Sequence, residues 1–192
     1  MIQVDHIVNF VFTSLTWVLS ICGSDCVWLV DCGDCDKIVN QLTGRKVVGV
    51  LLTHAHFDHI YGLPELLDLF PQCRVYSNEA GRVTIADVRK NMSLYHDTPV
   101  SVEGKYICLC DDKSEIPLFD GISAKVFSTP GHHSSCLSFM VGDYFFTGDA
   151  YIPGIKVVTN MPGGNKAQAQ ESVALIQELS KGKQICPGHI VV

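Results

Sequence analysis

The stretch Thr53-His54-Ala55-His56-Phe57-Asp58-His59 decides how this sequence is interpreted. It places three imidazoles and one carboxylate within six positions, directly after the apolar, β-branched run of residues 47–52. Such a run, bounded by Gly44 and by polar residues, predicts a fully buried strand. The four polar side chains therefore follow the end of a buried strand, and in an α/β sheet that edge is where ligands bind.

Further metal-type ligands follow other predicted strands. Imidazole nitrogens and carboxylate oxygens are ligands that zinc and iron accept. Strand-like segments run into Pro130-Gly131-His132-His133, into Thr147-Gly148-Asp149 and into Pro187-Gly188-His189. Glycine permits a sharp turn and proline presets its entry, so each imidazole can be aimed inward. An exposed polar loop with histidines by chance is the alternative, but three such turns beside a triple-histidine stretch favour a metal site.

The size and charge of the chain narrow the class of protein. Hydrophobic residues make up 47% and charged residues 18% of the 192 positions, which is typical of a globular chain. We interpret residues 1–192 as a single domain. The net charge of −6, with scattered lysines and arginines, gives no general support for nucleic-acid binding, so we expect a small-molecule substrate.

The apolar segment 7–22 and the nine cysteines bear on location. The segment has no basic residue before it and polar residues interrupt it, so we interpret it as two strands and expect neither a signal peptide nor a membrane span. Most cysteines lie in apolar, strand-like surroundings, which favours reduced structural thiols and a cytoplasmic protein. Cys32 and Cys35 form a C-x-x-C, for which a redox or metal role stays open.

The remaining pattern alternates short strands with helices. Helices are predicted over residues 35–42, 64–70, 79–88 and 166–179. Strands are predicted over residues 3–12, 15–22, 26–30, 47–52, 74–77, 106–110, 116–121, 122–128, 136–141, 144–146 and 184–186. Val39 in the first helix and Leu69 in the second are expected to belong to buried faces.

These motifs, in this order, resemble the metallo-β-lactamase superfamily of dinuclear metal hydrolases. The resemblance covers nearly the whole chain. It implies an α/β fold, the four-layer αβ/βα sandwich, in which two facing mixed β-sheets carry helices on their outer faces. It also implies a metal site at one edge of the sandwich, between the sheets.

The resemblance implies a role for each candidate residue. The implied ligands are His54, His56 and His132 for the first metal and Asp58, His59 and His189 for the second, with Asp149 as the bridge. Asp31 is implied to orient the loop that carries these histidines. His133, Tyr151 and Lys156 are candidate substrate contacts, although each is equally well interpreted as an ordinary loop residue, and His133 as an exposed one.

The implied chemistry is hydrolysis by a hydroxide that bridges two divalent metal ions. Zinc is the default, and iron or manganese also suits the ligand set. Asp149 and His59 favour small glyoxalase II-like thioesterases and lactonases, since many β-lactamases of this fold carry Cys or Ser at the position of Asp149. A mononuclear-iron enzyme similar to the persulfide dioxygenases is the alternative. A phosphodiesterase or a non-catalytic metal-binding module is less favoured.

Two features distinguish this sequence from the family pattern. His133-Ser134-Ser135-Cys136 stands where Thr-x-Gly-Ser is common, which changes the familiar substrate loop. The sequence ends three residues after His189, so we expect no C-terminal helical domain of the kind that holds glutathione in full-length glyoxalase II. A hydroxyacyl-glutathione substrate is therefore left open.

Overall fold

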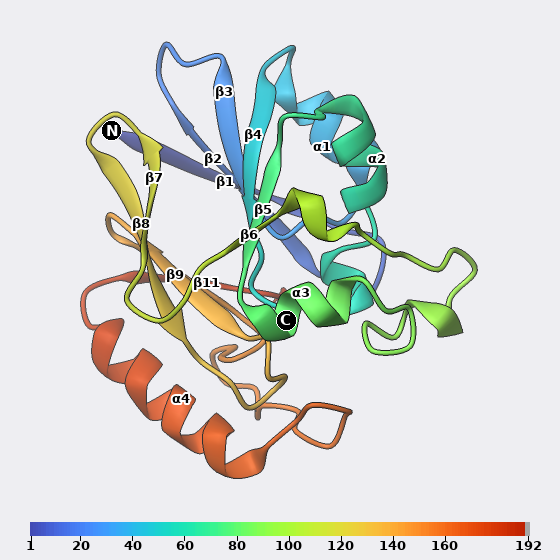
Figure 1. Cartoon of the computed structure of the whole chain (residues 1–192). Coiled ribbons are helices and arrows are strands. Elements are labelled where there is room, and N and C mark those ends of the chain that lie inside the picture. The colour runs from blue at the N-terminus through green and yellow to red at the C-terminus, as the bar shows by residue number, and fades with distance from the viewer. Residues whose placement is uncertain (191–192) are drawn as a thin grey trace.

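The computed structural model describes residues 1–190 and contains two mixed β-sheets (Figure 1). The first sheet has six strands in the order β1-β2-β3-β4-β5-β6. Their bounds are β1 Ile2–Val8, β2 Leu15–Ile21, β3 Cys26–Val30, β4 Lys46–Leu51, β5 Arg74–Ser77 and β6 Ile107–Leu109. The strands β1 to β3 pair antiparallel and β3 to β6 pair parallel, so the carboxyl ends of β3, β4 and β5 meet at one edge.

The second sheet has five strands in the order β11-β10-β9-β8-β7. Their bounds are β7 Glu115–Phe119, β8 Ile122–Ser128, β9 Leu137–Val141, β10 Tyr144–Gly148 and β11 Gln184–Pro187. Only β10 and β11 pair parallel. Their carboxyl ends therefore lie together, as those of β3 and β4 do in the first sheet.

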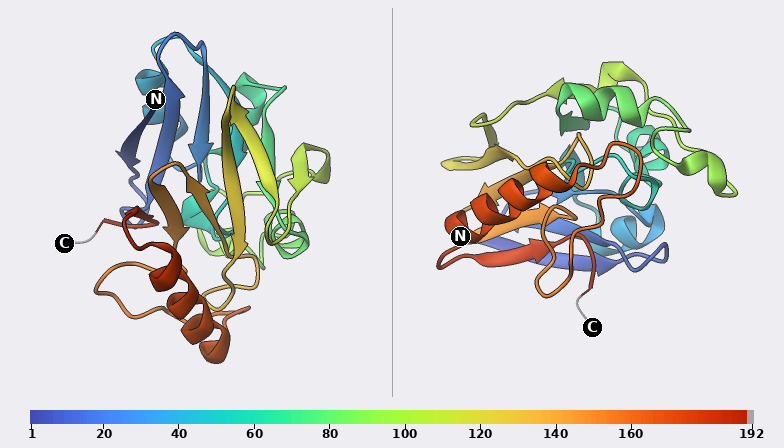
Figure 2. Two further views of the ribbon diagram at one scale, coloured as in Figure 1. Left: turned by 90° about the vertical axis from the view of Figure 1, so that its left-hand side faces the viewer. Right: turned by 90° about the horizontal axis from the view of Figure 1, so that it is seen from below.

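Four α-helices cover the outer faces of the two sheets. Their bounds are α1 Cys35–Leu42, α2 Leu63–Leu69, α3 Glu79–Ile85 and α4 Lys166–Leu179, with short 3-10 helices at Phe57–His59, Ser93–Tyr95 and Gly104–Tyr106. The helices α1 and α2 lie on the far side of the first sheet from α4, which lies against the second (Figures 1 and 2). The order of layers is therefore helix, sheet, sheet, helix, as predicted.

Three apolar clusters fill the spaces between these layers. One joins α1 and α2 to the first sheet around Ile38 and Leu66, and a second lies between the sheets around Trp28 and Phe139. A third joins α4 to the second sheet around Ile176. Alternate residues of a strand face opposite sides of a sheet, so each sheet can contribute to two clusters at once.

The predicted elements are largely present, but two expected core positions are wrong. Val39 is 38% exposed and Leu69 is 52% exposed. In α1 the buried residues include Ile38 and Leu42, and in α2 they include Leu66. Helices this short bury only one narrow stripe of side chains, and Val39 and Leu69 lie beside that stripe.

The first predicted strand, over residues 3–12, ends early at Val8. Asn9 turns its side chain inward and donates to the hydroxyls of Ser14 (3.2 Å) and Thr16 (3.1 Å). Phe12 then takes a left-handed backbone conformation with φ of 52°. The result is a tight turn in place of the last residues of the strand.

Two further observations concern membrane-spanning helices and the cysteines. Within residues 1–190, no helix is long and apolar enough to cross a membrane. None of the cysteines of that part forms a disulfide. Burial raises the pKa of Cys32 and raises that of Cys35 to about 12, so neither is a reactive thiolate near neutral pH.

Candidate metal centre

The two sheets are joined by backbone hydrogen bonds at the edge where the ligand-bearing turns lie. The N–H of Leu137 in β9 donates to the carbonyl of Thr53, which follows β4, over 2.8 Å. The N–H of Leu15 in β2 donates to the carbonyl of Gly188, which follows β11, over 2.7 Å. These bonds hold strand ends from distant parts of the chain next to one another.

The seven candidate ligands converge at this edge. Three groups each offer ligand atoms that all lie within 4.8 Å of one another. The groups are His54, His56 and His132; His54, His59 and Asp149; and Asp58, His59 and His189. Five of the seven are buried, and Asp149 and His189 are half-buried. The arrangement therefore contains two sets of three, with Asp149 reaching both.

Asp31 anchors two of the histidines. Its carboxylate accepts from the backbone N–H of Thr53 (2.8 Å), from the Thr53 hydroxyl (2.7 Å) and from Nδ1 of His59 (2.9 Å). Because the Thr53 hydroxyl donates to Asp31, it accepts from Nδ1 of His54, which lies 3.2 Å away. Both imidazoles therefore carry a proton on Nδ1 and turn Nε2 toward the cluster, where it is available to a cation.

Backbone carbonyls orient two further imidazoles in the same way. Nδ1 of His132 donates to the carbonyl of Val158, and Nδ1 of His189 donates to the carbonyl of Phe12, each over 2.9 Å. Nε2 of His189 then lies 3.3 Å from a carboxylate oxygen of Asp149. A carbonyl accepts hydrogen bonds but cannot donate them, so both rings again direct Nε2 at the cluster.

Several ligand atoms lack a hydrogen-bond partner in the described part of the chain. Nε2 of His54, Nε2 of His59 and Oδ1 of Asp149 are buried and make no hydrogen bond to any of residues 1–190. Nδ1 of His56 and Nε2 of His132 face one another over 2.9 Å. Buried polar atoms are normally paired, so this concentration of unpaired polar atoms fits a divalent cation. A set of nitrogen and oxygen donors suits zinc, iron or manganese.

The first set of three histidines is electrically neutral. Burial, aided by the neighbouring imidazoles, lowers the pKa of His54 well below its usual value and that of His56 to about 3. Burial also lowers the pKa of His132. Near neutral pH these rings therefore offer lone pairs without first losing a proton.

The second set is charged. Burial opposes the charge on each group, but the carboxylates of Asp58 and Asp149 outweigh it and raise the pKa of His59 well above its usual range. Hydrogen bonds to the same carboxylates raise the pKa of His189 to about 10, again against the effect of burial. Without a bound cation, protons on these two imidazoles balance the carboxylates. A divalent cation would displace those protons.

Glycines of the sequence motifs make room for this packing. A Cβ at Gly188 would collide with Oδ1 of Asp149 and would lie 2.9 Å from Cε1 of His59. Gly148 has a φ of +50°, and a Cβ there would lie 2.5 Å from the Thr53 hydroxyl oxygen. The glycines before His189 and Asp149 are therefore required by close approach of the backbone as well as by the turn.

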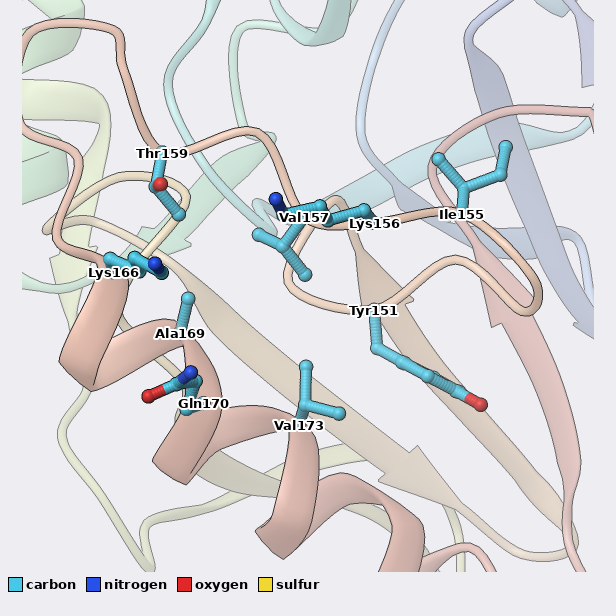
Figure 3. Close-up of a pocket in the computed structure, with 9 residues that line it drawn as sticks. All are labelled: Tyr151, Ile155, Lys156, Val157, Thr159, Lys166, Ala169, Gln170 and Val173. Carbon is cyan, nitrogen blue, oxygen red and sulfur yellow. The ribbon is translucent and has the colours of Figure 1, made fainter.

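The three candidate substrate contacts occupy different places. His133 is only 5% exposed, so the interpretation of it as an exposed histidine is wrong, and its ring centroid lies 5.0 Å from that of His56. Tyr151 and Lys156 lie outside the ligand cluster and line a separate pocket of about 340 Å³ between their loop and α4 (Figure 3). Val173 of α4 faces them across it.

The sequence did not single out two groups that orient the ligands. Thr53 links Asp31 to His54, and its place directly before the first histidine at a strand end could have drawn attention to it. The carbonyl of Phe12, which accepts from His189, gives no signal in the sequence, because a backbone acceptor carries no residue preference.

Comparison with known proteins places the chain in a family. The family model described as the metallo-beta-lactamase superfamily matches residues 10–189. The hydroxyacylglutathione hydrolase of Salmonella arizonae is 27% identical over 175 residues, which are 90% of this chain and 60% of that protein. The chain spans between 55% and 64% of the length of the curated relatives that were compared.

Solved structures show the same fold at low sequence identity. BLEG-1 B3 metallo-beta-lactamase matches with a TM-score of 0.84 and 21% identity, over 98% of this chain and 92% of that one. TTHA1623, solved in a di-iron-bound form, matches with a TM-score of 0.82 and 21% identity, over 97% and 92%. Together, the layered sheets, the ligand-bearing strand ends and the family match lead to one assignment. The chain belongs to the metallo-beta-lactamase superfamily.

Proposed function

We propose that this protein is a metal-dependent hydrolase that cleaves a thioester, or a related ester or lactone, with water activated by two divalent cations. The observation that carries the proposal is the division of seven buried or half-buried ligands into two sets of three that share one carboxylate. The similarity to hydroxyacylglutathione hydrolases supports a thioester substrate. Bound in this cluster, two cations would lower the pKa of water and polarise the acyl oxygen.

In this proposal zinc is the default metal, with iron or manganese compatible with the same donors. The proposed ligands of the first ion are His54, His56 and His132; those of the second are Asp58, His59 and His189; and Asp149 binds both. The di-iron form of a structural neighbour supports room for two ions in this fold. Asp31 would act behind the ligands, by fixing the tautomers of two histidines.

Activated water is favoured over a protein nucleophile. Cys136, four residues after His132, is fully buried, and burial raises the pKa of its thiol far above neutral pH. Ser135 is fully buried, and its hydroxyl oxygen accepts from the N–H of Ala55 over 3.2 Å. Neither side chain is free to attack a carbonyl carbon.

The pocket between the 151–164 loop and α4 is the proposed binding site for one part of a small-molecule substrate. Tyr151 and Val157 line it from the loop, and Val173 lines it from the helix (Figure 3). Lys156 and Lys166 give it positive charge. The carbonyl of Val158 in the same loop holds His132, which ties this wall to the ligand cluster.

The test combines metal analysis with an activity panel. The purified protein is loaded with zinc, iron or manganese, and its metal content is measured by mass spectrometry beside turnover of acyl thioesters, lactones, a β-lactam and a phosphodiester. We expect two metals per chain and thioester turnover that His54→Ala abolishes. His6→Ala, which removes an exposed histidine from β1, is the matched control and retains turnover.

Other results would favour the alternatives. One iron per chain, together with oxygen consumption in the presence of a persulfide, would select the mononuclear dioxygenase. Metal binding with only background rates on every substrate would select a non-catalytic module. Either result would refute the proposed hydrolase.

A further inference from the structure

His133 stands where the family pattern commonly has threonine, and its ring is fixed in one orientation. Nδ1 accepts a hydrogen bond from the backbone N–H of Ser135 over 3.0 Å. The Ser135 hydroxyl lies 2.7 Å from the same nitrogen. Because an N–H donor occupies Nδ1, the proton of the neutral ring is on Nε2. His133 therefore presents an N–H donor at the far end of its ring.

That donor is not hydrogen-bonded to any described residue. The His133 side chain is buried, and Nε2 makes no hydrogen bond within residues 1–190. It lines a pocket of about 490 Å³ together with Glu79, Lys90 and Ser134. Gly163, with a φ of +82°, forms another wall, and a Cβ there would lie 2.6 Å from Nε2. An unpaired N–H donor on the wall of a pocket of this size is available to an acceptor from a ligand.

The charges around the pocket indicate the chemistry of that acceptor. Glu79 is paired with Arg82, whose Nε lies 2.9 Å from its carboxylate, so its negative charge is offset. Within residues 1–190, Lys90 has no carboxylate within salt-bridge distance. The pocket thus combines one N–H donor with one unpaired cation, which suits a carboxylate.

The pocket adjoins the ligand cluster. The ring of His133 contacts that of His56 edge to face, with centroids 5.0 Å apart, and His132 precedes it in the chain. This pocket and the one lined by Lys156 lie on different walls, since the first includes residues of α3 and the second residues of α4. A substrate bound at the cluster could therefore extend one arm into each.

We propose that this pocket binds a carboxylate of the substrate, with Nε2–H of His133 and the ammonium group of Lys90 as donors. The proposal rests on the proposed hydrolase function and narrows it to acyl thioesters that carry an anionic arm. It names His133 and Lys90 as specificity-determining residues. Neither residue is assigned a role in the activation of water.

The test uses pairs of thioesters that differ only in a carboxylate. S-glutaryl and S-pentanoyl N-acetylcysteamine place the difference on the acyl side, and S-acetyl 3-mercaptopropionate and S-acetyl propanethiol place it on the thiol side. A charge-assisted hydrogen bond contributes enough for a preference of roughly tenfold or more. We expect the zinc-loaded wild type to prefer the carboxylate member of one pair by about this factor, mainly through a lower KM.

Variants identify the residues responsible for the preference for the carboxylate-bearing thioester. Lys90→Met and His133→Phe should each reduce the preference to near unity, whereas Lys90→Arg should retain it. Lys46→Met, an exposed lysine at the opposite end of β4 from the cluster, is the matched control and should leave the preference unchanged. If His133→Phe fails to fold, the two Lys90 variants decide, because that side chain is exposed.

A binding measurement separates this inference from the proposed function. Glutarate is titrated into the zinc-loaded protein, and the imidazole Cε1–H resonance of His133 is followed by NMR. A saturable shift in the wild type that Lys90→Met abolishes would support the carboxylate site even if no thioester were hydrolysed. Equal rates for both members of each pair, a preference that only Lys156→Met removes, or no response of His133 to glutarate would overturn the proposal.

Discussion

Replacing Asp31 by asparagine tests whether the ligand set depends on the groups behind it. Asp31 is 1% exposed and accepts three hydrogen bonds, two from Thr53 and one from His59. An asparagine side chain has one acceptor oxygen and one amide group that only donates. It therefore cannot accept all three hydrogen bonds, because the Thr53 N–H donates to one carboxylate oxygen, and the Thr53 hydroxyl and Nδ1 of His59 donate to the other.

The expected losses of metal affinity and stability follow from these contacts. If the amide faces Nδ1 of His59, the ring must move its proton to Nε2, the atom that would bind the second cation. Substitutions behind a metal ligand weaken metal affinity by roughly 10–100-fold. Hydrogen bonds to a buried charged group contribute about 1.5–3 kcal/mol each, so the metal-free protein should also lose a few kcal/mol of stability.

The assay measures metal affinity by competition with a chelator, beside the free energy of unfolding in urea. We expect Asp31→Asn to bind the first ion nearly normally and the second at least about tenfold more weakly. Asp34→Asn is the matched control, because Asp34 accepts from the N–H of Phe10 over 2.8 Å and lies outside the cluster. Two ions bound to Asp31→Asn with wild-type affinity would refute the reasoning.

Three further predictions follow from the same geometry. The raised pKa values of His59 and His189, the latter about 10, keep both rings protonated at pH 7. Metal binding should therefore release about two protons per chain, which calorimetry in buffers of different ionisation enthalpy measures. Metal binding without proton release would contradict this prediction. Gly188→Ala should lose the second metal by collision with the shared carboxylate. Gly104→Ala should bind two ions, because the nearest atom to an added Cβ there is Nη1 of Arg82, 3.9 Å away. Ile176→Ala should cost about 2–5 kcal/mol in urea unfolding and leave metal affinity intact, since that side chain is fully buried under α4 and away from the cluster.

The sequence was most informative where a buried strand runs directly into a polar turn. The run before His54 and the turn that carries His132 each combine a strand pattern with ligand side chains, so their location at a sheet edge could be predicted. The sequence could not predict contacts that depend on the path of the backbone. The turn at Phe12 replaces the end of a predicted strand, and its carbonyl, which accepts from His189, has no signature in side-chain chemistry. Likewise, only the packed structure reveals that His133 is buried.

The distribution of ligands between the sheets makes metal binding a contribution to folding as well as to chemistry. The triple-histidine stretch follows a strand of the first sheet, whereas His132, Asp149 and His189 follow strands of the second. A cation held by both groups therefore cross-links the sheets at the edge where only a few backbone hydrogen bonds join them. At free metal a thousandfold above its Kd, such binding contributes about 4 kcal/mol, or roughly 10 °C in Tm for a chain of this size.

Removal of metal should consequently loosen this edge before the rest of the fold. The N–H groups of Leu15 and Leu137 donate across the two sheets, so their hydrogen exchange should accelerate when a chelator strips the protein. The N–H of Val50, within the parallel pairing of the first sheet, should keep its protection and serves as the internal control. Equal acceleration of exchange at all three positions would mean that metal stabilises the whole fold uniformly. The metal would then not act by cross-linking the two sheets at this edge.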